Sequence, residues 1–381
     1  MEAHMTINAL QDNVPLLKKM MADMNSQNEV YRPGPLWSRL ATEGAKALKR
    51  YGLGSFRSSG KATAGAFANI TDAPMLSVYD YKWASPETLR GKLAQVIFEN
   101  GIFRRILLDR FDKALRLGAE AYYFKFYRFY RDYYVNQHSR DWFSEVLRYH
   151  SMPNTMAGGC IDGIRICDQI VAPVYFVTLA RIFNFHDHID FRAIKTVFII
   201  GGGFGYEAHL IMSLFPNIKK CITLDIPPTL YVQTQYLRAV MEERVIDYAE
   251  TCKMDRICFS GGEEREIIAI APWQIENVDA SIDLLWNSCS FQEMTPAQVR
   301  NYALFSQNLM AKVADPKICL AMYGDQPFTA PTTSRIQILD AFAGFSFERI
   351  QASRKFWPLP PSDESYEEFN YIGRKLSPTT P

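Results

Sequence analysis

Residues 196–225 most constrain what this chain can fold into, because a strand, a glycine loop, a helix, a strand and an acid follow one another there. The apolar run Val197–Ile200 is typical of a buried parallel strand, and it leads into Gly-Gly-Gly-Phe-Gly. A helix is expected over 206–215, and a second strand, Cys221–Leu224, stops at Asp225. This order predicts a nucleotide-like cofactor at the carboxyl edge of a parallel sheet, where glycines let the backbone approach a ligand.

The spacing of the glycines distinguishes between classes of cofactor. A dinucleotide fingerprint has the form G-x-G-x-x-G, or ends in Ala, so that a helix N-terminus can hold a pyrophosphate. The frame that starts at Gly201 has Tyr206 in the last place. The spacing that fits is G-x-G-x-G, at Gly201, Gly203 and Gly205.

The loop and the acid resemble two motifs of one enzyme class. G-x-G-x-G resembles motif I of the class I S-adenosylmethionine-dependent methyltransferases, and Asp225-Ile226-Pro227 resembles their second motif. The resemblance implies S-adenosylmethionine as the cofactor, and Asp225 can accept hydrogen bonds from ribose hydroxyls. Members of the class usually carry an acid two residues before the first glycine, where this chain has Ile199. The alternative is an NAD(P)-dependent oxidoreductase of Rossmann type.

From residue 196 onward, apolar runs alternate with helical stretches, which predicts an α/β domain. The expected strands are Val197–Ile200, Cys221–Leu224, Ile257–Ser260, Ile282–Asn287, Ile318–Tyr323, Phe347–Gln351 and Phe369–Gly373. The expected helices are 206–215, 229–241, 263–270, 296–312 and 333–343. Since no helix separates the last two strands, an antiparallel hairpin is expected there. The predicted fold class is α/β, with a seven-stranded Rossmann-like methyltransferase sheet in residues 191–381.

Residues 1–190 are predicted to form a mostly helical domain that serves as a lid, a substrate domain and the surface of a homodimer. Its expected helices include 10–24, 36–51, 86–99 and 169–185. Residues 121–143 interleave many aromatic side chains with bases, a pattern that can stack nucleotides. The formal net charge of +1 gives no electrostatic drive toward nucleic acid. Burial in a bundle or a dimer interface is therefore the preferred interpretation.

Composition also indicates the cellular location of the protein and the classes of partner that it binds. Seven cysteines are scattered without a C-x-x-C pair, which is typical of reduced thiols in a cytosolic protein. The first 30 residues contain charged side chains and no apolar core segment, so no signal peptide is predicted. No window approaches a membrane span. We therefore expect a cytoplasmic protein without a nucleic-acid or membrane partner.

Two histidines flank an acid in His186-Asp187-His188, a composition that suggests a metal site. The i,i+2 spacing suits a strand or a loop, and no third ligand is evident in the sequence. A surface loop is the preferred interpretation, and no metal site is predicted.

Catalytic candidates come from the end of the fourth expected strand and from the helix after the glycine loop. Methyl transfer requires an aligned acceptor and often the removal of a proton. Glu293 follows the polar strand end that starts at Asn287, and His209 lies one helical turn past Gly205. Either could take the proton. The structural alternatives are a helix-capping acid for Glu293 and a packed histidine for His209.

The remaining candidate site residues share a position at the glycine loop, at strand ends or beside the loop that precedes the α/β domain. Cofactor binding is assigned to Gly201, Gly202, Gly203, Gly205, Asp225, Ile226, Ser260, Asn287 and Ser288. Substrate binding is assigned to Tyr206, Gln292 and His150.

Several segments together resemble the sugar O-methyltransferase family. They are I-G-G-G-F-G, L-F-P-N, L-D-I-P-P-T-L-Y and N-S-C-S-F-Q-E-M-T-P, with D-G-I-R at 162–165 and the N-terminal Y-R-P-G-P-L-W. The match covers residues 150–310 well and the remainder loosely. The resemblance implies transfer of a methyl group to a hydroxyl of a sugar or a sugar-like natural product. A catalytically silent, cofactor-binding partner protein is the alternative from another class.

Overall fold

The computed structural model describes residues 10–54, 56–57, 157–158, 164–166, 169–241, 244–323, 332–350, 354–355 and 366–376. The expected helix 86–99, the aromatic segment 121–143 and the substrate candidate His150 lie outside the described residues. The N-terminal helices are α1 (Val14–Asn25), the 3-10 turn η1 (Glu29–Tyr31) and α2 (Pro35–Tyr51). A small hairpin follows, made of β1 (Ile164–Ile166) and β2 (Gln169–Val171).

The α/β part begins with α8, which lies before the main sheet. Its helices are α8 (Pro173–His186), α9 (Tyr206–Leu214), α10 (Thr229–Val240), α11 (Tyr248–Thr251), α12 (Pro296–Met310) and α13 (Arg335–Ala341). Its 3-10 turns are η3 (Phe191–Ala193), η4 (Pro272–Asn277) and η5 (Phe291–Glu293). Its strands are β3 (Thr196–Ile200), β4 (Lys220–Leu224), β5 (Arg244–Ile246), β6 (Glu266–Ile270), β7 (Leu284–Ser288), β8 (Lys317–Tyr323), β9 (Phe345–Ile350), β10 (Arg354–Lys355) and β11 (Tyr366–Lys375).

The main sheet has the order β10-β11-β8-β7-β3-β4-β6-β5, with β9 also paired to β11. Strands β3 to β8 run parallel to one another. Strand β11 runs antiparallel to both β8 and β9, which confirms the expected antiparallel pair at the end of the chain. Chain order reverses at β3, since β4 lies on one side of it and β7 on the other. Such a switch point leaves a crevice at the carboxyl ends of the strands.

The α/β class is confirmed, but the sheet has nine strands rather than seven in the part of the chain that the structure describes. The two additional strands, β5 and β10, are three and two residues long. Such short segments give no periodic pattern that a sequence can show.

The third expected strand is displaced along the sequence. Residues 263–270, expected to be helical, contain β6 instead, whose five residues are all buried. The expected strand Ile257–Ser260 makes only an isolated bridge, between Ile257 and Val278. The acids that precede β6 resemble the first turn of a helix, but Ile267–Ile270 is an apolar run of strand length that ends before a proline.

The expected helix 169–185 is also wrong at its start. Gln169 lies in β2, and α8 begins at Pro173. Proline suits the first position of a helix because that position has no intrahelical partner for an N–H group.

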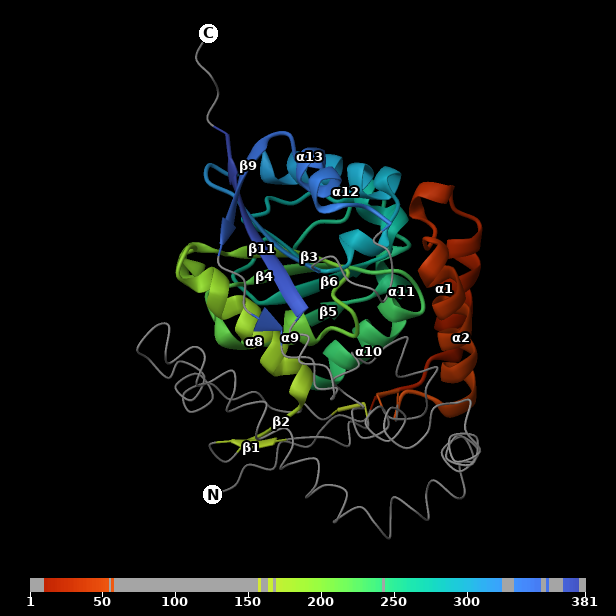
Figure 1. Cartoon of the computed structure of the whole chain (residues 1–381). Helices are drawn as coiled ribbons and strands as arrows, with labels where there is room; N and C mark the ends of the chain where they lie inside the picture. Colours follow the sequence, from red (N-terminus) through yellow and green to blue (C-terminus); the bar gives the residue numbers. More distant parts are fainter. Residues whose placement is uncertain are drawn as a thin grey trace, which may run out of the picture.

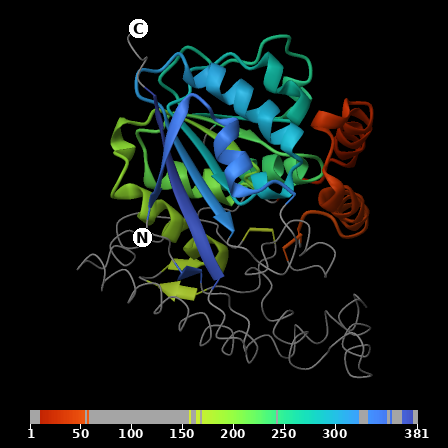
Figure 2. The same ribbon diagram turned by 45° about the horizontal axis from the view of Figure 1, so that its top comes forward.

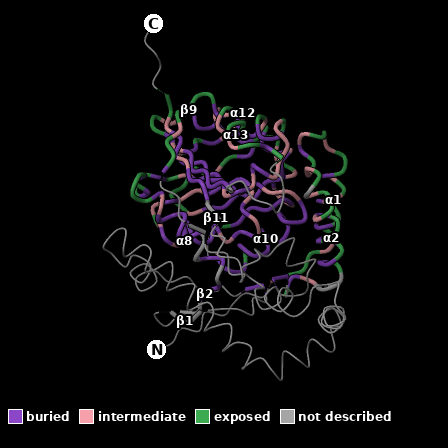
Figure 3. The backbone as a smooth tube through the Cα atoms, viewed as in Figure 1, coloured by how far each residue is buried: buried purple, intermediate pink, exposed green. Residues whose placement is uncertain are grey.

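Helices cover both faces of the sheet (Figure 1). On one face, Val197, Ile199 and Trp286 pack with residues of α8, α9 and α10. On the other, Phe198 and Ile200 pack with residues of α12 and α13. The strands between these layers are therefore buried on both sides (Figure 3), as parallel strands usually are.

The N-terminal helices pack against this domain. In Figures 1 and 2, α1 and α2 lie together at the side of the sheet and its helices. Leu16, Leu17 and Met20 of α1 are buried in the same apolar cluster as Val197, and Tyr248 donates a hydrogen bond to Asp23. The division at residue 190 and the homodimer stay predictions. Among the described residues, no helix combines the length and apolar character needed to span a membrane.

Candidate active site

The glycine loop joins β3 to α9 at the switch point of the sheet. Gly201, Gly203 and Gly205 all have positive φ, at 73°, 57° and 102°, a conformation that other residues adopt only with strain. Gly201 also has no room for a side chain, because a Cβ there would lie 2.2 Å from Oγ of Ser290. The G-x-G-x-G spacing thus matches the backbone geometry of the loop.

Asp225 follows β4 at the same edge and contacts the loop directly. Its carboxylate accepts hydrogen bonds from the N–H of Gly203, at 3.0 Å, and of Ile226, at 2.8 Å. Burial, together with the negative charges of Glu293 and Glu207, raises the pKa of Asp225 to about 8 against the opposing effect of these two N–H groups. The side chain remains partly exposed, and a carboxylate oxygen has lone pairs for more than one donor.

Gln233 of α10 connects the glycine loop to β4. Its Nε2 donates to the carbonyl of Gly203 at 3.0 Å, and its Oε1 accepts a hydrogen bond from Thr223 of β4. Gln233 was not among the residues predicted from the sequence. A polar residue within an amphipathic helix gives no sign of the neighbour that it will meet, so no sequence signal could have singled it out.

Asn287, predicted to contact the cofactor, is buried and supports the loop. Its Nδ2 donates to the carbonyl of Ile200 at 2.9 Å and to Ser290 at 2.5 Å, and its Oδ1 accepts from the N–H of Phe291. These bonds connect the end of β7 to the end of β3. Ser288, the last residue of β7, accepts a hydrogen bond from the indole of Trp286 and stays partly exposed.

Ser260 lies away from the other cofactor candidates, which corrects that prediction. Its N–H and hydroxyl donate to Glu266, at the start of β6, and Glu266 pairs with Lys220 at the start of β4. Ser260 therefore lies at the amino edge of the sheet, opposite the glycine loop. The error follows from the strand expected at 257–260, whose end would have reached the carboxyl edge.

His209 lies in the turn of α9 next to the glycine loop, where its N–H donates to the carbonyl of Gly205, but its side chain is buried between α8, α9 and α10. Its Nδ1 lies 2.8 Å from the hydroxyl of Tyr175 and 3.2 Å from that of Tyr236, and its side chain is 1% exposed. Burial, together with the positive charge of Arg57, lowers the pKa of His209 to about 3. His209 is therefore a neutral packed histidine, and it is removed as a catalytic candidate.

Glu293 lies in η5, beyond the end of β7 and on the cofactor side. Its Oε2 accepts a hydrogen bond of 2.8 Å from the indole of Trp37 in α2, and its charge acts on Asp225. The helix-capping alternative does not hold, because α12 has its own capping box, formed by Thr295 and Gln298.

The two described substrate candidates differ in exposure. Tyr206 is partly exposed in the first turn of α9 and packs against Phe204, with ring centroids 5.0 Å apart. Gln292 is buried, at 3% exposure, and its carbonyl accepts the N–H of Thr332. Tyr206 can therefore line an acceptor site, whereas the buried Gln292 holds the backbone at Thr332.

A buried charged cluster that was not predicted from the sequence lies beside the loop. Arg181 of α8 donates to both carboxylate oxygens of Glu368 in β11, from Nε to Oε1 and from Nη2 to Oε2, and lies 3.6 Å from Glu207 of α9. Burial raises the pKa of Glu207 against the opposing charge of Arg181. An acid in the first turn of a mostly apolar helix was a signal that could have revealed Glu207.

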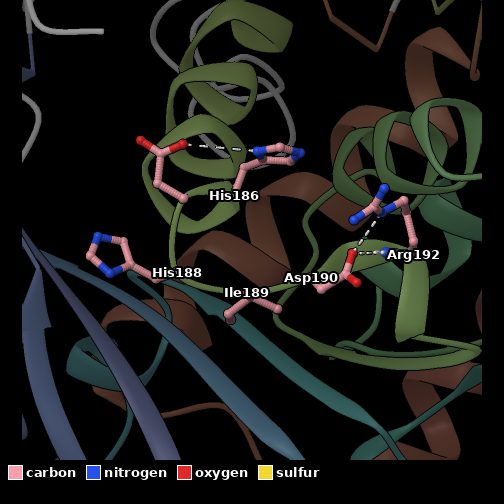
Figure 4. Close-up of a pocket in the computed structure, with 6 residues that line it drawn as sticks. His186, His188, Ile189, Asp190 and Arg192 are labelled. Atoms are coloured by element: carbon pink, nitrogen blue, oxygen red, sulfur yellow. Dashed lines mark hydrogen bonds and ion pairs between the residues drawn. The ribbon is translucent and has the colours of Figure 1, made fainter.

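The His186-Asp187-His188 segment lies at the amino edge, before β3. It lines a hollow of about 510 Å³ with Ile189, Asp190 and Arg192. Figure 4 shows the two imidazoles pointing apart, and Asp190 is held by Arg192. Over the described residues, no three His, Cys, Asp or Glu side chains are grouped as metal ligands would be.

Comparisons with known proteins leave the family open. No protein-family model matches the chain, and no curated protein matches it. Among solved structures, one similar protein is the N,N-8-amino-8-demethyl-D-riboflavin dimethyltransferase RosA from Streptomyces davawensis, at 12% identity and a TM-score of 0.35 over 53% of this chain and 56% of that one. Another is the mitomycin 7-O-methyltransferase MmcR, at 14% identity and a TM-score of 0.30 over 52% of this chain and 54% of that one.

A third is the O-methyltransferase TomG from Streptomyces achromogenes, solved in complex with SAM, at 12% identity and a TM-score of 0.33 over 55% of this chain and 84% of that one. This chain thus spans little more than half the length of the first two proteins. Likenesses of this size do not identify its activity, and the functional argument rests on the site itself.

Proposed function

We propose that this chain is an S-adenosylmethionine-dependent O-methyltransferase that acts on a hydroxyl of a sugar or a sugar-like natural product. The observation that carries the proposal is the hydrogen bond from the N–H of Gly203 to Asp225, at the switch point of the sheet. It joins a loop with three glycines at positive φ to an acid that can accept ribose hydroxyls. The antiparallel β11 beside β8 suits a methyltransferase sheet better than a nicotinamide-binding one.

The residues at this edge fit the proposed cofactor. Gly201, Gly202, Gly203 and Gly205 let the backbone approach it, and Asp225 offers its carboxylate to the ribose. When bound, S-adenosylmethionine supplies an electrophilic methyl group. Asn287 holds the loop to the end of β7, and Ile226 and Ser288 are partly exposed beside the site.

The chemistry that the chain itself must supply is positioning of the acceptor and removal of its proton. A sugar hydroxyl is a weak acid, so a positioned base contributes to its methylation. We assign this role to Glu293, the one of the two initial candidates that lies on the cofactor side. Tyr206 and Gln292 are proposed to shape the acceptor site, and His150 stays a prediction.

Calorimetric titration with S-adenosylhomocysteine is the direct test. We expect binding by the wild type and at least about tenfold weaker binding by Asp225→Ala, because the carboxylate that accepts the ribose is lost. Asp190→Ala is the matched control, since Asp190 is an exposed acid at the opposite edge. Absence of binding at millimolar ligand, or tight binding of NADH instead, would overturn the proposal and favour the oxidoreductase.

The proposed base is tested by turnover once a screen of hydroxylated sugars identifies an acceptor. Glu293→Gln should lower kcat by about 10²–10⁴. A near-normal rate would remove Glu293 from the role. A chain that binds S-adenosylhomocysteine but shows no single turnover with any acceptor would instead favour a silent binding partner.

A further inference from the structure

The N-terminal segment 29–38 runs along the loops that follow β6 and β7. The hydroxyl of Tyr31 donates to Glu276 in η4. The carbonyl of Arg32 accepts a hydrogen bond from Gln298 in the first turn of α12. The segment therefore binds to elements at the carboxyl edge of the sheet, although it lies more than 240 residues away from them in the sequence.

The same segment reaches the proposed base. Nε1 of Trp37 donates to Oε2 of Glu293 at 2.8 Å. Gly34 approaches the backbone of Glu293 so closely that a Cβ there would lie 3.3 Å from its carbonyl oxygen. Trp37 is only partly exposed, so its ring has few orientations in which to make this bond.

Glu293 acts in turn on Asp225. Its negative charge is one of the causes that raise the pKa of Asp225, after burial. Within the part of the chain that the structure describes, the other titratable groups that act on Asp225 are Glu207 on α9 and Tyr302 on α12. The position of the Glu293 carboxylate therefore affects the group that is proposed to accept the ribose.

We propose that Trp37 is a positioning residue of this site, whose indole N–H holds the carboxylate of Glu293, the proposed base, in place. The N-terminal segment then contributes to the methyl-transfer centre itself and does more than brace the domain. The inference rests on the proposed function. It requires a donor at the ring nitrogen, which phenylalanine lacks.

The test is the pH dependence of S-adenosylhomocysteine affinity between pH 6 and 9, measured by calorimetry. Affinity should rise as Asp225 ionises, with a midpoint near pH 8 in the wild type. Glu293→Gln removes a neighbouring charge and should lower the midpoint by roughly half a pH unit. Trp37→Phe should lower it in the same direction, because the released carboxylate can move away from Asp225.

Two comparisons separate positioning from bracing. Adding Trp37→Phe to Glu293→Gln should cause no further shift, because the indole then has no charge to position. Tyr31→Phe removes another contact of the same segment, that with Glu276, and should leave the midpoint at its wild-type value. A bracing role predicts instead that Trp37→Phe and Tyr31→Phe behave alike.

A second readout does not depend on how well Trp37→Phe folds. In ¹⁵N-labelled protein, the indole signal of Trp37 should shift both in Glu293→Gln and on addition of S-adenosylhomocysteine. An unmoved indole signal in Glu293→Gln, or an unmoved midpoint in Trp37→Phe, would overturn the inference while leaving the proposed function in place. Failure of the wild type to bind S-adenosylhomocysteine would overturn both.

Discussion

At the scale of single residues, Asp225 links the site to pH. Its raised pKa means that the folded protein binds more protons than the unfolded chain between about pH 4 and pH 8. Stability should therefore fall as pH rises through this window, and Asp225→Asn should flatten the decline. Urea unfolding at several pH values measures this, and parallel pH profiles for the two proteins would contradict it.

The same residue predicts proton release on cofactor binding. Ribose hydroxyls favour the ionised carboxylate as acceptor, so binding at pH 7 should release close to one proton from Asp225. The binding enthalpy of S-adenosylhomocysteine should then differ between phosphate and Tris buffers, whose ionisation enthalpies differ. Asp225→Asn should lose that dependence. Equal wild-type enthalpies in the two buffers would show that Asp225 does not change its protonation.

Gln233 allows a test of the glycine loop that involves only neutral groups. Gln233→Leu leaves the carbonyl of Gly203 without its donor, and the loop loses a fixed position. A lost hydrogen bond of about 1 kcal/mol corresponds to roughly fivefold weaker binding of S-adenosylhomocysteine. Gln235→Leu on the same helix is the control, because Gln235 is also buried but does not contact the loop. Equal affinities for both variants would contradict the role of Gln233.

The sequence was informative about residues whose role is set locally. Gly201, Gly203 and Gly205 and Asp225 could be identified because the loop geometry and the strand end lie within 25 consecutive residues. Trp37, Gln233 and Glu207 acquire their roles from neighbours on other elements, and their positions depend on how helices rotate on the sheet. The catalytic prediction for His209 was wrong for the same reason. Its spacing from Gly205 indicates how far along α9 it lies, but does not indicate which face of the helix carries its side chain.

At the scale of elements, β6 is the strand for which the sequence pattern predicted the wrong secondary structure. The acids before it indicated a helix, whereas Glu266 is the buried first residue of a strand. Its carboxylate accepts both hydrogen bonds of Ser260 and pairs with Lys220 and Arg244. The pairs with Lys220 and Arg244 join different strands of the sheet, so no local propensity could reveal them.

This assignment predicts that Glu266 stabilises the amino edge and has no part in cofactor binding. Glu266→Gln should lower the free energy of unfolding by about 1–3 kcal/mol, because a buried charged partner is lost. Affinity for S-adenosylhomocysteine should stay at the wild-type value in both Glu266→Gln and Ser260→Ala. Urea unfolding and calorimetry measure the two effects. Weakened binding by Ser260→Ala would restore Ser260 to the cofactor set.

At the scale of the whole molecule, the α/β fold could be predicted because parallel strands buried on both faces give apolar runs of a characteristic length. The placement of the N-terminal helices could not. Asp12 accepts the N–H of Leu53, and Asn13 donates to the hydroxyl of Tyr231. The first contact joins the two ends of the N-terminal helical part, and the second joins this part to α10. An amphipathic pattern shows only that a helix has a buried face.

The shared core predicts that the N-terminal helices and the sheet unfold together. Met20 is fully buried in the cluster that contains Val197 and Leu284. Met20→Ala should therefore lower the free energy of unfolding of the sheet by about 2–4 kcal/mol. Circular dichroism and tryptophan fluorescence should report one shifted transition in urea. Lys18→Ala, at an exposed position of the same helix, is the control. Two separate transitions, with only the smaller one moved by Met20→Ala, would instead make α1 and α2 an independent folding unit, as the division at residue 190 implies.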